Sequence, residues 1–142
     1  MTITGGCLCG AVRYRIEAEP IQVRACWCRD CQFVGAGSGT VNATFPSEAV
    51  HVEGELRDYA SRAASGNVLH RSFCPKCGTP VTTQSEVRRH LISIRAGTLD
   101  DPEIAKPMMT IWTKSAPSWA AIDSSIPCEE GQPAPPTQTP KA

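Results

Sequence analysis

The sequence lacks both a net charge and any long apolar run, and each absence narrows what the protein can be. Its 14 Lys and Arg residues balance 14 Asp and Glu residues, so it offers no electrostatic footprint for nucleic acid or an anionic membrane surface. No stretch approaches the roughly 20 apolar residues of a membrane-spanning helix. The 142 residues are enough to bury one core. We therefore expect one domain with neither a nucleic-acid nor a membrane partner.

The amino-terminal residues also lack the basic region and apolar run of a secretory signal peptide. Eight cysteines among 142 residues is about 6%, below the density of a small disulfide scaffold. We therefore expect a cytoplasmic protein. In that reducing compartment, clustered cysteines are metal ligands or catalytic thiols rather than disulfides.

Seven of the eight cysteines are present in three tight clusters. The clusters are Gly-Cys-Leu-Cys-Gly (Cys7, Cys9), Cys-Trp-Cys-Arg-Asp-Cys (Cys26, Cys28, Cys31) and Cys-Pro-Lys-Cys-Gly (Cys74, Cys77). A Cys-x-Cys pair fits disulfide geometry poorly, whereas thiolates at such spacings can point at one metal ion. The Cys-Pro-Lys-Cys-Gly segment is typical of a zinc knuckle, in which backbone N–H groups point at the sulfurs and glycine permits a positive φ. The sequence therefore predicts metal binding.

Between the clusters, apolar and polar residues alternate with the period of half-buried strands. We expect strands at 12–16, 21–25, 40–45, 50–53, 56–59, 68–73, 80–83, 91–95 and 108–113. Glu19-Pro20 and Gly54-Glu55 are typical of turns, so 12–16 with 21–25, and 50–53 with 56–59, are candidate hairpins. From residue 127 the chain is rich in proline and polar residues, which predicts a zinc-binding domain at 1–126 and a mobile tail at 127–142.

The spacing leaves open how the seven thiols divide. A structural zinc ion takes four protein ligands, whereas a catalytic one takes three and keeps an open position. One division places the two pairs on one ion and the triplet on another. The alternative is an ordinary four-cysteine ribbon of Cys28, Cys31, Cys74 and Cys77, which leaves Cys7, Cys9 and Cys26 unused.

The three clusters, in this order and with Thr-Pro following Cys77-Gly78, resemble the glutathione-dependent formaldehyde-activating enzyme family, also called the centromere-protein-V domain family. The resemblance runs from about Gly5 to Trp119. It implies an all-β, tent-like fold of curved antiparallel sheets and two Zn²⁺ ions per chain. One ion would be structural, on Cys7, Cys9, Cys74 and Cys77. The other would be catalytic, on Cys26, Cys28 and Cys31, with an open position.

The same resemblance implies a carbon–sulfur lyase that reversibly joins a thiol, such as glutathione, to an aldehyde. Family members often carry histidine between the first two cysteines of the triplet, and here that residue is Trp27, for which we expect a packing role. His51, His70 and His90 are expected to be structural, Asp30 to be solvated and Cys128 to be a free thiol. The alternative function is a zinc-stabilised binding module without turnover.

Overall fold

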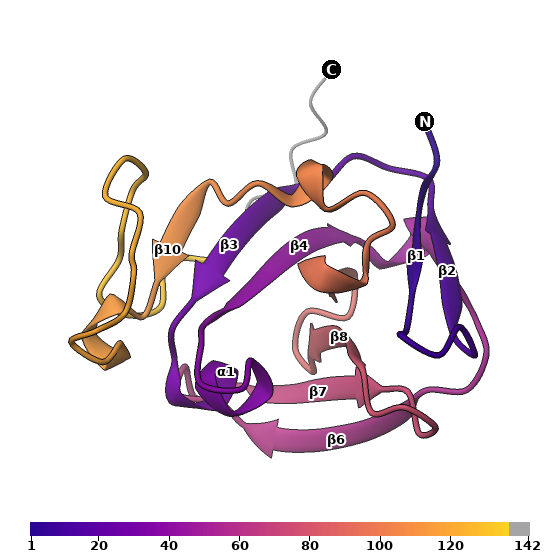
Figure 1. The fold of residues 1–142 in the computed structure, drawn as a ribbon, viewed down its shortest axis with the longest axis horizontal. Coiled ribbons are helices and arrows are strands. Elements are labelled where there is room, and N and C mark those ends of the chain that lie inside the picture. Colours follow the sequence, from indigo (N-terminus) through magenta and orange to yellow (C-terminus); the bar gives the residue numbers. More distant parts are fainter. Residues whose placement is uncertain (137–142) are drawn as a thin grey trace.

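The computed structural model describes residues 1–136 and shows an all-β fold built from two sheets (Figure 1). The smaller sheet has the order β1-β2-β5, and the larger has the order β10-β3-β4-β9-β8-β7-β6. The strands are β1 (Ile3–Gly6), β2 (Arg13–Ile16), β3 (Gln22–Cys26), β4 (Thr40–Pro46), β5 (Val50–Glu53), β6 (Arg57–Arg62), β7 (Val68–Phe73), β8 (Pro80–Ser85), β9 (Leu91–Arg95) and β10 (Met109–Ile111). A six-residue helix, α1 (Arg29–Val34), follows β3. The predicted all-β class is confirmed.

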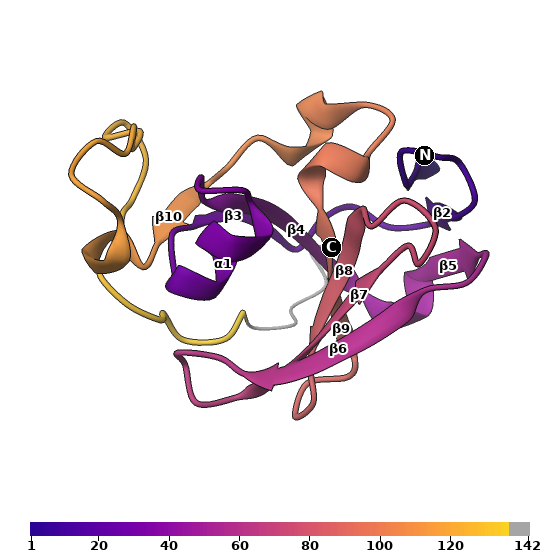
Figure 2. The ribbon, with the colours of Figure 1, turned by 60° about the horizontal axis from the view of Figure 1, so that its bottom comes forward.

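The larger sheet curves strongly between its two ends. Figures 1 and 2 show β3 and β4 on one side of the molecule and β6 and β7 on the other, with α1 beyond the end of β3. Four 3-10 turns lie in the described part, at Ser47–Ala49, Ala96–Thr98, Pro102–Ala105 and Thr113–Ser115. None of the helices in residues 1–136 has the length and apolar character needed to cross a bilayer.

Strand β1 is absent from the sequence-based prediction because two of its four residues, Gly5 and Gly6, have weak β propensity. Its pairing with β2 depends on Gly5, since a Cβ there would overlap the hydroxyl of Tyr14 and the carbonyl of Thr98. The close approach of these groups therefore requires glycine, and it joins the smaller sheet to the turn after β9.

Both candidate hairpins are wrong. Strand β2 pairs with β1 and β5, while β3 pairs with β4 and β10, so residues 17–21 connect two sheets. Strands β5 and β6 likewise belong to different sheets. Gly54 does turn the chain, with φ +98°, but the turn carries it from one sheet to the other. Alternation predicts which face of a strand is buried, whereas its partner is decided by long-range packing.

The larger sheet has one apolar face and one polar face. Val23, Ala43 and Ile94 pair across β3, β4 and β9 and are at most 2% exposed. They belong to the main core, which also contains Phe45 and Val12. The residues that alternate with them point to the other side of the sheet. That polar side forms the wall of the site described below.

The strand pairs are antiparallel, as predicted, except that β10 pairs with β3 in parallel. The first residues of the proposed tail also lie along β10. The amide of Thr110 donates to the carbonyl of Pro127 at 3.0 Å, and the amide of Glu129 donates to the carbonyl of Thr110 at 2.8 Å. The chain just beyond residue 127 is thus hydrogen-bonded to the sheet. The domain boundary at that residue stays a prediction. Residues 137–142 lie outside the described part.

Candidate metal centres

The first cysteine group joins the two sheets. Cys7 and Cys9 lie in the loop after β1, and Cys74 and Cys77 lie in the turn between β7 and β8. The Sγ atoms of the four residues lie within 4.8 Å of one another. The distance from the Sγ of Cys9 is 3.6 Å to that of Cys7 and 3.9 Å to that of Cys74. The structure thus brings together the two pairs that the sequence places 65 residues apart.

Nearby donors favour the thiolate form of Cys7 and Cys77 in this group. The amide of Val12 donates to the Sγ of Cys7 at 3.2 Å. The hydroxyl of Thr79 lies 3.1 Å from the Sγ of Cys77, and hydrogen bonds from Thr79 lower the pKa of Cys77 to about 5. The Gly78 amide donates to the carbonyl of Cys74 at 2.8 Å, and the φ of Gly78 is +77°. This is the tight turn predicted for a zinc knuckle.

The spacing of these sulfurs fits a tetrahedral metal ion. Four sulfurs at about 2.3 Å from Zn²⁺ would be about 3.8 Å apart, and the two distances above bracket that value. All eight cysteines are free thiols. The donor set, four sulfurs with none from oxygen or nitrogen, suits a soft or borderline metal such as zinc. The group can therefore hold a closed, four-coordinate ion.

The second group is formed by Cys26, Cys28 and Cys31, all buried and with their Sγ atoms within 4.8 Å of one another. Cys26 ends β3, and Cys28 caps α1 by accepting a hydrogen bond from the amide of Cys31 at 3.4 Å. Hydrogen bonds from Cys26 and then Cys28 lower the pKa of Cys31, so this group favours at least one thiolate. Among residues 1–136, three residues and not four make up this group.

The loop that carries the triplet is fixed by Gln32, which sequence reasoning missed. Its buried side-chain amide donates to the carbonyls of Trp27 and Ser115, each at 2.9 Å. The Trp27 side chain is itself buried, and its ring lies so close to Gly39 that a Cβ there would be 3.1 Å from it. Trp27 therefore packs as expected and does not line the adjoining cavity.

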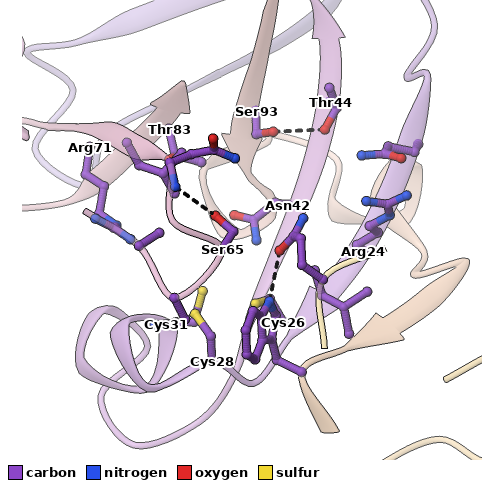
Figure 3. Close-up of a pocket in the computed structure, with 18 of the residues that line it drawn as sticks. Arg24, Cys26, Cys28, Cys31, Asn42, Thr44, Ser65, Arg71, Thr83 and Ser93 are labelled. Atoms are coloured by element: carbon purple, nitrogen blue, oxygen red, sulfur yellow. Dashed lines mark hydrogen bonds between the residues drawn. The ribbon is translucent and has the colours of Figure 1, made fainter. Parts of the chain in front are cut away.

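A cavity of about 170 Å³ opens beside the triplet (Figure 3). Its wall is the polar face of the larger sheet, together with the loop at 63–67 and the end of β10. Two rows of paired residues cross this wall. One row is Arg24, Asn42 and Arg95, and the other is Gln22, Thr44, Ser93, Thr83 and Arg71. The three cysteines lie together at one end of the cavity in Figure 3.

Sequence reasoning also missed the four arginines that line this cavity, Arg24, Arg71, Arg88 and Arg95. Arg24 alternates with buried residues and reads as an ordinary solvent-facing position in a strand. Its placement two residues before Cys26 was the available signal, because both side chains must point to the same face. For Arg71 and Arg95 the sequence offers no such signal, because their proximity to the triplet follows only from the strand order.

None of the other residues singled out from the sequence lines the cavity. The Nδ1 atom of His70 lies 2.6 Å from a carboxylate oxygen of Asp58, and neither His51 nor His90 lines the cavity. Asp30 accepts a hydrogen bond from Arg71 at 3.3 Å, so it is an ion-pair partner rather than a fully solvated group. Cys128 is exposed and outside both cysteine groups.

The chain matches known proteins over most of its length. The family model described as glutathione-dependent formaldehyde-activating enzyme matches residues 2–115. A Halomonas elongata protein, whose name places it in that family, is 24% identical over 131 residues, which cover 87% of this chain and 83% of the relative. A crystal structure of a Rhodobacter sphaeroides protein has the same fold, with a TM-score of 0.57 and 21% identity over 73% of this chain and 96% of that chain. Because the family model matches most of its length, the chain belongs to the glutathione-dependent formaldehyde-activating enzyme family.

Proposed function

We propose that the protein is a zinc-dependent enzyme of the carbon–sulfur lyase type, acting on glutathione or another thiol–aldehyde adduct. The observation that carries this proposal is the placement of Cys26, Cys28 and Cys31 at one end of a cavity, as a group of three sulfurs. Three protein ligands beside a cavity are typical of a catalytic zinc site, whereas four protein ligands are typical of a structural one. Membership of the family supports the same reading.

In this proposal the two cysteine groups have different roles. Cys7, Cys9, Cys74 and Cys77 would hold the structural ion, and the triplet would hold the second. When bound there, zinc would supply a Lewis acid and favour the thiolate form of an incoming thiol. The reaction joins the substrate sulfur to the aldehyde carbon, while the thiol proton moves to the carbonyl oxygen. The reverse direction breaks the same bonds, and no electrons are gained or lost.

The chain's own contribution is to hold and orient the reactants. Gln32 fixes the loop that carries the triplet, and the cavity wall limits the positions that a thiol and an aldehyde can take. Holding two reactants in one orientation is a major source of rate enhancement. The eight free thiols support a reducing compartment, and we propose the cytoplasm as the location.

Cobalt substitution tests the proposal directly. Sulfur-to-metal charge-transfer bands report each thiolate bound to Co²⁺, so millimolar glutathione should increase the band in the parent protein and not in Cys28→Ser. In parallel, exchange between formaldehyde, glutathione and their adduct, followed by NMR, should be faster with the parent than without protein. The absence of any band change with glutathione and every other small thiol would refute thiol binding at the triplet. A band change without faster exchange would indicate a binding module.

A further inference from the structure

The cavity is strongly basic although the whole chain is neutral. Four guanidinium groups line it, from Arg24, Arg71, Arg88 and Arg95, and the described residues of its wall include no aspartate or glutamate. The arginines therefore contribute a formal charge of +4 to the wall, whereas the chain has equal numbers of acidic and basic residues. Concentrating one sign of charge in a recess raises the local concentration of ligands with the opposite sign.

The four arginines fall into two classes. Two have side-chain partners: Arg71 donates to Ser61 at 2.7 Å and to Asp30 at 3.3 Å, and Arg95 donates to Asn42 at 2.7 Å. Their guanidinium groups are fixed in place by the protein itself.

Arg24 and Arg88 form the other class. Both are half-buried, and within residues 1–136 neither side chain has a hydrogen bond or an ion pair. Glu129 is the acidic residue whose charge acts on Arg24, but the two make no ion pair. A second hollow, of about 160 Å³, adjoins the first, and both arginines line both hollows. They therefore present free donors where the cavity continues beyond the triplet.

The sheet sets the distance between these donors and the cysteines. Arg24 lies two residues before Cys26 on β3, so their Cα atoms are about 7 Å apart. Arg24 and Arg95 lie on one row, separated by β4, which places their Cα atoms about 10 Å apart. A molecule whose thiol and anionic group are separated by a few covalent bonds would span from the triplet to Arg24. Figure 3 shows Arg24 and Arg71 on opposite sides of the space above the cysteines.

We propose that Arg24 and Arg88 form an anion subsite that binds carboxylate groups of the substrate, so that the enzyme selects anionic thiols and their aldehyde adducts over neutral or cationic ones. Guanidinium groups match carboxylates through paired, charge-assisted hydrogen bonds. The inference rests on the proposed function, because the triplet receives the sulfur. Glutathione, with two carboxylates, belongs to this class, and so does mercaptosuccinate.

The subsite can be tested without thiol chemistry. S-methylglutathione keeps both carboxylates but has no free thiol, and its binding to the metal-loaded protein can be measured by isothermal titration calorimetry. Arg24→Gln and Arg88→Gln should each weaken binding by about tenfold or more, the effect of losing a hydrogen bond to a charged group. Arg88→Lys should retain part of the affinity, because it keeps the charge. Arg89→Gln is the matched control, since Arg89 is exposed and lies outside both hollows.

A second measurement separates this inference from the proposed function. The charge-transfer band of the cobalt protein, titrated with 2-mercaptoethanol, reports thiol binding without any carboxylate. Tight, arginine-dependent binding of S-methylglutathione, with mercaptosuccinate preferred over cysteamine in the cobalt titration, supports the subsite. If the two Gln variants fold, as judged by their thermal melts, and bind S-methylglutathione like the parent, the subsite is refuted even where the cobalt band responds to thiols. If S-methylglutathione binds through the arginines but no thiol changes the band, the subsite stands and the proposed function fails.

Discussion

Replacing Cys74 with serine should remove the connection between the two sheets at the four-cysteine group. Cys74 is completely buried, and its Sγ lies 3.9 Å from that of Cys9. The group is reached from the smaller sheet by the loop after β1 and from the larger sheet by the turn after β7. A metal ion held there would cross-link the chain. Without one sulfur the site would be left with three ligands.

The size of the effect follows from the length of chain that is closed. Cys9 and Cys74 are 65 residues apart, and a cross-link over a loop of this length stabilises the folded state by about 4 kcal/mol through chain entropy alone. A structural zinc site contributes on the order of 10 kcal/mol, comparable to the roughly 5–15 kcal/mol that stabilises a whole domain. We therefore expect Cys74→Ser to lower the melting temperature by at least about 12 °C, and at the upper limit to unfold the domain.

Circular dichroism melts together with metal analysis provide the assay. Cys7→Ser should reproduce the loss, because Cys7 belongs to the same group. Cys128→Ser is the control, since that thiol is exposed and outside both groups, and it should melt with the parent. A Cys74→Ser protein that melts at the parent's temperature would refute the assignment of a structural ion to these four residues.

Three further predictions concern the triplet and the backbone. Cys28→Ser should lower the metal content by about one ion per chain and keep the fold, since a catalytic site is not the main cross-link; loss of all metal and of the fold would instead favour a binding module with two structural ions. Gln32→Ala should cost about 1–3 kcal/mol, as judged by urea unfolding, because it leaves two carbonyls without their buried donor; an unchanged midpoint would contradict its positioning role. Gly54→Ala should destabilise more than Gly66→Ala, because both have positive φ but only at Gly54 would a Cβ overlap a backbone carbonyl. Equal melting temperatures for the two variants would show that this overlap relaxes freely.

The sequence by itself determined the local chemistry of the protein. Three cysteine clusters with Cys-x-Cys, Cys-x-Cys-x-x-Cys and Cys-x-x-Cys spacing indicate metal ligands, because short spacings direct several sulfurs to one point. Alternating residues at 68–73 and 91–95 predict strands that the structure confirms at the same bounds. These features depend on neighbours along the chain, so they can be predicted from the order of the amino acids alone.

The tertiary structure decided which distant groups meet. It excludes the four-cysteine ribbon, because Cys74 and Cys77 lie with Cys7 and Cys9 and the triplet lies apart. It also gathers four arginines at the cavity, although nothing in the local sequence of Arg88 or Arg95 marks them as neighbours of a thiol group. Strand order and curvature produce both results. They depend on packing between residues far apart in sequence, whereas alternation specifies only the face on which a side chain lies.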